Sequence, residues 1–298
     1  STVNSYSEDN EIEKVLQTIQ KDLKTLEKAV YSDSFSESKV TTNSNQNLND
    51  NSEDVLTRHL LKLSDIEKQF QVLNELDICY LDLRKAWGIN VADLDDRQIQ
   101  DLKLACRKYS IKISCIGSPV GKSLITDNLD ETKATLKRIL DIAVLLETDK
   151  VRIFSFYPPQ NQHQDKYIEQ SVRRLKSMAE LAETYGVILI MENENGLIGD
   201  TPERCRKILD NVGSNNLRFV WDTGNFPHLG VENSVDIGWP ILSDYVECVQ
   251  IKDARLSDRK ITVAGEGDGQ ILKLLQFLKQ FYLPFSLLNL YQTGVQSG

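Results

Sequence analysis

From about residue 55 onward, the chain alternates between two patterns of apolar and polar positions. Short runs that are almost continuously apolar are separated by longer stretches in which apolar residues recur every three or four positions. The first pattern predicts strands of a parallel sheet, whose two faces are covered by helices, and the second predicts amphipathic helices. The predicted strands span residues 78–84, 111–119, 150–157, 187–193, 217–225, 246–254 and 284–290, with a weaker candidate at 58–64.

Eight strand–helix units in one chain favour a closed (β/α)8 TIM barrel, an α/β fold that typically takes about 250 residues. A doubly wound open sheet is the alternative, but no GxGxxG motif follows the first strand. We therefore expect residues 55–298 to form one barrel. After the last predicted strand only YQTGVQSG remains, which is too short for the helix that normally closes the ring.

The first 54 residues follow a different pattern. Apolar residues between Ile12 and Val30 recur at alternating steps of four and three, which predicts one stripe along a helix. Residues 32–54 are polar and nearly devoid of large apolar side chains, as expected for a linker. Residues 1–54 are thus predicted to be a helical extension plus a linker. Two roles stay open for the helix: it fills the gap left by the missing last helix, or it joins copies of the chain into a homo-oligomer.

Charge and composition narrow the range of partners. The formal net charge of −9 argues against nucleic acid and against anionic membrane surfaces, because both attract basic patches. No apolar run approaches the roughly 18 residues of a membrane-spanning helix, and the first residues do not resemble a secretion signal. The five cysteines are widely spaced without a CxxC motif, so we expect reduced thiols in the core. These features predict a cytoplasmic protein.

Polar side chains gather where the predicted strands end, and in a barrel the active site lies at those carboxyl ends. Glu192 and Glu194 end one strand, Asp222 and Asn225 end the next, and Lys252 ends the one after that. Converging carboxylates are costly to bury unless a cation neutralises them. Oxygen ligands of this kind suit Mg²⁺ or Mn²⁺. The sequence therefore indicates a divalent-metal site as one interpretation.

The other interpretation is a structural ion-pair cluster, in which Glu192 and Asp222 bond to Lys252 or Arg84, and spacing alone leaves both open. Arg84 and Lys122 are also candidates for holding a phosphate or carboxylate of a substrate at the barrel mouth, although such residues are usually solvated. Glu266, in the glycine-rich segment GEGDG, is a further candidate for contacting a substrate. A glycine-rich turn is more often conformational than ligand-binding.

Several motifs follow one another in a characteristic order: DLRKAWGINVADL, CIGSPVGK, VRIFSFYPP, MENENGLIGDT, WDTGNF, IKDA and GEGDG. Over residues 65–288 this order resembles the sugar phosphate isomerase/epimerase family, which shares the xylose isomerase-like barrel with tagatose epimerases. The resemblance implies a barrel that acts on a small carbohydrate-like substrate. It also implies a divalent metal, Mn²⁺ or Mg²⁺, held by Glu, Asp, His and Glu from strands five to eight.

Residue by residue, Glu192 matches the first Glu of that metal site and Asp222 matches the Asp. Gln250 stands where the family has His, and Asn289 stands where it has the last Glu. An amide oxygen can bind a hard cation, but it brings no charge and binds more weakly. A frameshift would explain the change at Asn289, because the codons TTG-AAC-CTN for residues 288–290 contain GAA-CCT, which encodes Glu-Pro; a natural ending is the other explanation.

The resemblance also implies a reaction. Family enzymes move a proton between adjacent carbons of a metal-bound hydroxy-ketone or aldose, with two carboxylates as base and acid. Glu192 is the expected base here, but Asn289 cannot accept a proton, so an epimerase that needs both faces is expected to be badly impaired. A one-base isomerisation assisted by Lys252 or Glu194 is left open. The alternative is a catalytically impaired relative that binds a polyol or a protein partner without turnover.

Overall fold

The computed structural model describes residues 64, 66–281 and 288–289. Its centre is a seven-stranded sheet in the order β1-β4-β5-β6-β7-β8-β11, in which every neighbouring pair is parallel. Each strong strand predicted from the sequence contains one of these strands. They are β1 (Tyr80–Leu83), β4 (Lys112–Gly117), β5 (Lys150–Ile153), β6 (Ile188–Glu192), β7 (Leu217–Asp222), β8 (Val246–Gln250) and β11 (Leu288–Asn289).

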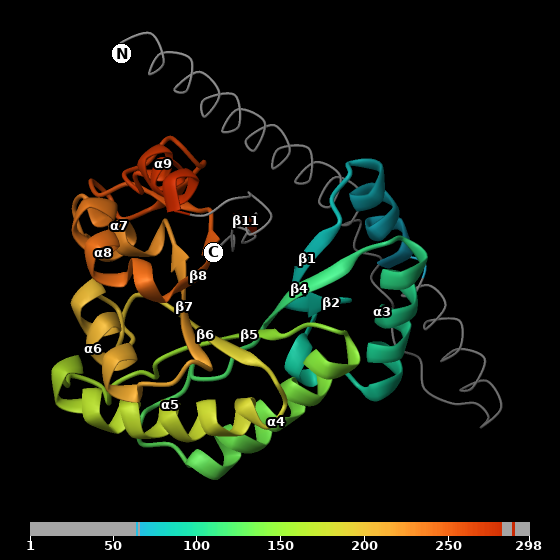
Figure 1. Ribbon diagram of the computed structural model, residues 1–298, viewed down its shortest axis with the longest axis horizontal. Coiled ribbons are helices and arrows are strands. Elements are labelled where there is room, and N and C mark those ends of the chain that lie inside the picture. Colours follow the sequence, from blue (N-terminus) through green and yellow to red (C-terminus); the bar gives the residue numbers. More distant parts are fainter. Residues whose placement is uncertain (1–63, 65, 282–287, 290–298) are drawn as a thin grey trace, which may run out of the picture.

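The sheet curls so that its two edge strands approach each other, and Cα atoms of β1 and β11 come within 8 Å. Helices lie along its outer side (Figure 1). This strand–helix alternation around a parallel sheet confirms the predicted TIM-barrel class. The weak strand at 58–64 falls outside the described residues except for Ser64, and residues 66–75 are helical. The predicted extension and linker, residues 1–54, also lie outside them.

The helices begin and end at residues with capping chemistry. Asp95 and Gln98 form a capping box at the start of the helix that spans residues 96–108, which satisfies backbone N–H groups that have no partner inside the helix. Gly213 ends another helix in the left-handed conformation at φ 60°. The α-helices are α3 (Asp96–Lys108), α4 (Leu129–Leu145), α5 (Ile168–Glu183), α6 (Pro202–Val212), α7 (Asn225–Leu229), α8 (Ser234–Leu242) and α9 (Ile271–Phe281).

Short elements decorate the connections. Two antiparallel pairs lie outside the main sheet, and single turns of 3-10 helix precede three of the longer elements. None of the described helices is both long and apolar enough to span a membrane. The short elements are β2 (Lys85–Ala86), β3 (Ile89–Asn90), η1 (Val91–Asp93), η2 (Gln164–Tyr167), η3 (Ser243–Tyr245), β9 (Asp253–Ala254) and β10 (Ile261–Thr262).

The buried side chains form two groups. A large cluster fills the space between the sheet and its helices, and a small one consists of Cys115, Ile190, Val220 and Cys248 on four different strands. Because side chains alternate between the two faces of a strand, this small cluster identifies the positions that point into the barrel. Two residues further along β6, β7 and β8, the same face carries polar side chains instead.

Candidate functional site

The strand register brings the predicted site positions together at the carboxyl end of the barrel. Asp222 on β7 pairs in register with Gln250 on β8, and Gln250 pairs with Asn289 on β11. Glu192 ends β6, next to β7, and pairs in register with Val220. Glu192, Asp222 and Gln250 each follow a residue of the inward-pointing cluster by two positions, so all three face the barrel interior. They are almost completely buried, with exposed fractions of 1%, 0% and 2%.

Two basic side chains neutralise the two carboxylates. The Lys252 ammonium lies 2.6 Å from Asp222 Oδ2 and 3.7 Å from Glu192 Oε1. On the other side, Arg152 Nη1 lies 2.8 Å from Glu192 Oε2. This is the ion-pair interpretation left open by the sequence, with Lys252 as the partner. Arg84, the alternative partner, makes no ion pair with Glu192 or Asp222 in the part of the chain that the structure describes.

Glu192 Oε1 and Asp222 Oδ1 accept hydrogen bonds from residues at the start of α7, directly after β7. Asn225 Nδ2 donates to Glu192 Oε1 at 3.1 Å. The backbone N–H groups of Gly224 and Asn225 both donate to Asp222 Oδ1, at 3.0 and 3.1 Å. Three of the four carboxylate oxygens therefore accept hydrogen bonds from the chain, and the fourth, Asp222 Oδ2, makes only the ion pair with Lys252. Asn225 thus lies within the predicted site and acts there as a partner of Glu192.

Burial and charge act in opposite directions on these groups. Burial raises the pKa of Asp222 to about 6 in spite of the Lys252 ion pair, and the negative charge of Glu192 adds to the rise. Burial would also raise the pKa of Glu192, but Arg152, Lys252 and Lys122 outweigh it and hold that pKa below its ordinary value. Glu192 is consequently the carboxylate that stays ionised.

A third carboxylate belongs to the same interior. Asp82 on β1 accepts a hydrogen bond of 2.5 Å from Ser114 Oγ on β4. Burial raises the pKa of Asp82 to about 6, against the lowering effects of Ser114 and Arg152, and Glu192 adds to the rise. The barrel interior thus holds three acidic and two basic side chains.

The rim of the mouth carries a more exposed ion pair. Lys122, in the loop after β4, lies 2.7 Å from Glu194, in the loop after β6. Their side chains are 30% and 27% exposed. The ammonium of Lys122 also lies 4.4 Å from the centre of the Phe154 ring, and the Arg152 guanidinium lies 4.5 Å from it. Lys122 and Glu194 are therefore predicted site residues that remain partly accessible to solvent.

Glu266 lies away from this cluster, on the exposed surface of the loop after β10. The loop folds around the carboxylate of Asp253, which accepts hydrogen bonds of 2.9 Å from the backbone N–H groups of Gly265, Gly267 and Gly269. A Cβ added at Gly267 would lie 2.4 Å from Asp253 Oδ1. The glycines of GEGDG are thus explained by this close approach. The substrate contact proposed for Glu266 stays a prediction.

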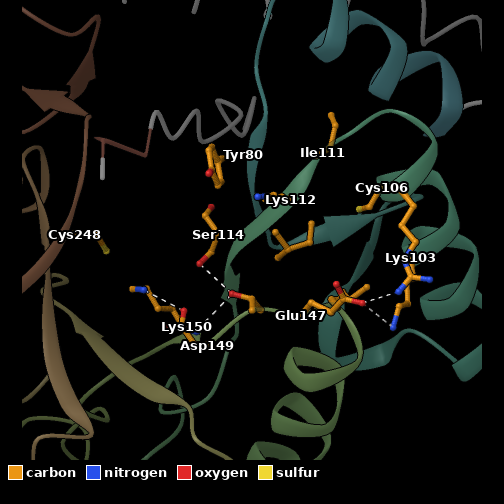
Figure 2. A pocket seen from close by; sticks show the side chains of 14 residues that line it. Tyr80, Lys103, Cys106, Ile111, Lys112, Ser114, Glu147, Asp149, Lys150 and Cys248 are labelled. Carbon is orange, nitrogen blue, oxygen red and sulfur yellow. Dashed lines mark hydrogen bonds and ion pairs between the residues drawn. The ribbon is translucent and has the colours of Figure 1, made fainter. Parts of the chain in front are cut away.

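A cleft of about 550 Å³ lies at the opposite, amino end of the sheet. Ser114, the partner of Asp82, lines this cleft, but Glu192, Asp222, Gln250, Lys252 and Arg152 do not. Figure 2 shows Lys103 turned toward Glu147, 3.2 Å away, and Lys150 beside Asp149, 3.1 Å away. Because active sites of TIM barrels lie at the carboxyl ends of the strands, the interior cluster, and not this cleft, is the candidate site.

The sequence profile of the xylose isomerase-like TIM barrel family matches residues 70–282. The chain belongs to this family. The predicted resemblance is thereby confirmed at the level of the xylose isomerase-like barrel. An uncharacterised protein of Methanocaldococcus jannaschii is 25% identical over 159 residues, which are 50% of this chain and 53% of that protein. The chain thus matches about half the length of this curated relative.

Solved structures show the same fold at low identity. The probable 3-DHS dehydratase AsbF of Bacillus anthracis has a TM-score of 0.61 at 15% identity, over 75% of this chain and 85% of that one. A family member from Mycobacterium smegmatis in complex with magnesium has a TM-score of 0.58 at 17%, over 78% and 83%. D-psicose 3-epimerase of Clostridium cellulolyticum with D-tagatose has a TM-score of 0.56 at 18%, over 72% and 75%.

Within this family fold, the side chains of the cluster do not fit a divalent cation. The Lys252 ammonium already lies between the two carboxylates, and Arg152 engages Glu192 from the other side. The next position in the row is a neutral amide, Gln250. Across the described ranges, no group of three or more His, Cys, Asp and Glu side chains is arranged to hold a metal. The chain's own cations supply the positive charge.

Sequence reasoning missed one residue of the cluster, Arg152. It was read only as part of the apolar run that predicts β5, yet its side chain is 6% exposed and contacts Glu192. A signal was present: Arg152 is the single charged residue within VRIFSFY, in a strand expected to be buried on both faces. An arginine at such a position needs a buried anion, and Glu192 on the next strand supplies it.

Proposed function

We propose that this chain binds a small carbohydrate-like compound at the carboxyl end of its barrel and does not carry out metal-assisted proton transfer. The family supports the ligand class, because its solved relatives include a D-psicose 3-epimerase with D-tagatose. The mouth offers groups that suit a hydroxylated ligand. The partly exposed Lys122 and Glu194 provide a hydrogen-bond donor and an acceptor side by side.

One observation carries the absence of turnover: Glu192 is held between Arg152 and Asn225, and Asp222 is held between Lys252 and two backbone N–H groups. A general base has to reach the substrate proton with an unoccupied lone pair and needs a pKa near the working pH. Glu192 meets neither condition, because Arg152 and Asn225 hold it and its pKa is lowered. The position of the second expected carboxylate is Asn289, whose amide cannot accept a proton.

An active isomerase or epimerase is the second candidate, and one observation favours it. The pKa of Asp222 is raised to about 6, which lies in the range of catalytic acids and bases. Asp222 would have to exchange its contact with Lys252 for a contact with substrate. Turnover would then depend on Asp222 rather than on Glu192, the base expected from the sequence.

The test separates binding from turnover. Binding is measured by calorimetry, in which D-tagatose and D-psicose are titrated into the full chain in a buffer that contains EDTA. Turnover is measured by incubating each sugar with the chain in D2O and following the exchange of C–H for C–D by NMR. We expect binding, weakened at least fivefold by Lys122→Met, and no exchange above the buffer rate. Arg206→Met is the matched control, because Arg206 is a partly exposed cation that pairs with Asp210 on α6, outside the site. Exchange that Asp222→Asn abolishes would establish the isomerase instead.

A further inference from the structure

We infer that the cleft at the amino end of the sheet is a second binding site, and that it takes a small aromatic phosphate. Its volume of about 550 Å³ suits such a ligand, because small-molecule sites usually measure about 300–1,000 Å³. The cleft lies at the end of the barrel opposite to the mouth. The inference therefore holds whether or not the proposed carbohydrate ligand is correct.

The wall of this cleft is positively charged, although the chain as a whole is acidic. Four basic and two acidic side chains line it, a surplus of two positive charges, whereas the whole chain has a formal net charge of −9. A phosphate monoester carries a charge of about −1.5 to −2 at neutral pH, so it would balance this surplus. The charged residues of the wall are Lys103, Arg107, Lys112, Lys150, Glu147 and Asp149.

The surplus charge lies on α3 and at the start of β4. Lys103 and Arg107, both on α3, share the single carboxylate of Glu147 at 3.2 and 2.7 Å. Lys112, the first residue of β4, is exposed and forms no ion pair with any residue that the structure describes. The fourth cation, Lys150, is already paired with its own aspartate at 3.1 Å. Lys112 is therefore the cation with which an incoming phosphate would pair.

Apolar groups beside Lys112 suit the aromatic part of the ligand. Tyr80, on the neighbouring strand β1, stands in register with Lys112, and both line the cleft (Figure 2). Tyr80 is 53% exposed, so its ring is available for stacking against a second ring. Cys106 and Ile111 line the cleft as well and are buried. A ligand with an aromatic ring next to its phosphate would use both kinds of contact.

A β-bulge lies where the cleft reaches the barrel interior. Leu81 pairs with Ile113, but Asp82 pairs with Cys115, so β4 contains one extra residue, Ser114. Ser114 is partly buried, lines the cleft and donates to Asp82. Bulges are common next to functional sites, where they redirect a side chain. The cleft thus extends inward from exposed residues at the strand ends to a partly buried hydroxyl, which gives it depth for part of a ligand.

The experiment uses phenyl phosphate as the probe, because it joins a phosphate to one aromatic ring. It is titrated by calorimetry into the full chain at about pH 8, where the phosphate is a dianion. We expect one site with an affinity at least fivefold higher than that for inorganic phosphate. Lys112→Met should weaken the binding of phenyl phosphate at least fivefold. Lys176→Met is the matched control and should behave as the wild type, because Lys176 is exposed on α5 and does not line the cleft.

Four results would overturn the inference. The first is no saturable binding of phenyl phosphate to the wild type up to millimolar concentrations. The second is inorganic phosphate that binds as tightly as phenyl phosphate. The third is equal binding by Lys112→Met and Lys176→Met. The fourth is binding that is lost in Lys122→Met, which would place the probe at the carboxyl end of the barrel.

Circular dichroism checks that each variant is folded. Lys112 is exposed, so its substitution should leave the fold intact, and Lys112→Gln replaces Lys112→Met if that variant does not fold. The same weakening is expected of Lys112→Gln, because it also removes the charge. Lys112→Met should leave D-tagatose binding unchanged, since Lys112 lies at the other end of the barrel from Lys122 and Glu194. A failure of the carbohydrate proposal and a failure of this inference are thus distinguishable.

Discussion

The guanidinium of Arg152 on β5 donates to the carboxylate of Glu192 on β6 at 2.8 Å, and both side chains are almost fully buried. Arg152→Met would leave the Glu192 carboxylate without its closest partner in a site closed to water. Removing one partner of a buried pair typically costs about 3–5 kcal/mol. We expect a loss of that size in the free energy of unfolding, measured by urea denaturation.

A matched comparison separates this effect from the loss of an ordinary salt bridge. Arg206 and Asp210 pair at 2.7 Å on α6 but are 36% and 43% exposed. Arg206→Met should therefore cost no more than about 1 kcal/mol from the lost pair. The double variant Arg152→Met with Glu192→Leu should recover much of the loss, because it removes both charges. Equal effects of the two arginine variants would contradict the buried-pair explanation.

Asp82 should make stability depend on pH. Its pKa is raised from 3.8 to about 6 by burial, so the folded state binds this proton more tightly than the unfolded state. The free-energy cost of ionising Asp82 in the folded state is absent below pH 4 and fully present above pH 6. The stability of the wild type relative to Asp82→Asn should therefore fall as the pH rises from 4 to 7. Urea denaturation at intervals of half a pH unit measures this.

Ser114→Ala provides the internal check on that pH effect. The Ser114 hydroxyl donates to Asp82 and lowers its pKa, so its removal should raise the pKa further. The decline in relative stability should then extend to higher pH than in the wild type. A relative stability that stays flat from pH 4 to 7 would show that Asp82 titrates as an ordinary carboxyl group.

Gly267→Ala should destabilise the loop that encloses Asp253. The added Cβ would lie 2.4 Å from Asp253 Oδ1 and 2.7 Å from the Ala254 carbonyl oxygen, so the loop has to move. We expect a loss of about 1–3 kcal/mol, the usual cost of such crowding. Glu266→Ala, at the exposed neighbouring position, should change stability by less than about 0.5 kcal/mol. If Glu266→Ala nevertheless weakens sugar binding, the predicted substrate contact gains support.

Gly224→Ala should disturb the site without changing any of its charges. Its Cβ would lie 2.8 Å from Lys252 Cβ and would push the lysine away from Asp222. We expect a loss of about 1–3 kcal/mol in the free energy of unfolding, the usual cost of such crowding, measured by urea denaturation. Asn211→Ala on α6 is the control, because Asn211 is exposed and its side-chain amide donates to the carbonyl of Lys207. Equal losses in both variants would argue against crowding of Lys252.

The barrel could be predicted because its strands are buried on both faces and therefore read as continuous apolar runs. The convergence of Glu192 and Asp222 could also be predicted, because both end parallel strands of one sheet. The identity of the cation that neutralises these two carboxylates could not be predicted. Lys252 was one of several candidates, and the choice depends on how Thr223 and Gly224 place its backbone, which no spacing in the sequence reports.

Two other residues show where pattern reading stops. Arg152 was hidden inside an apolar run, because the strand pattern says that a position is buried but not what it faces. The path of the loop that carries Glu266 could not be predicted either. It follows from three backbone N–H groups that bind Asp253 and that the sequence shows only as glycines, and the substrate contact of Glu266 stays a prediction.

The two interior cations, Arg152 and Lys252, have a consequence for how this chain matures. A mouth built on metal ions is completed only when the cell delivers the ion, and chelation can undo it. Here the charges that compensate Glu192 and Asp222 are part of the polypeptide. On the function proposed above, the mouth is therefore complete as soon as the barrel has folded, and shortage of a trace metal would leave it intact.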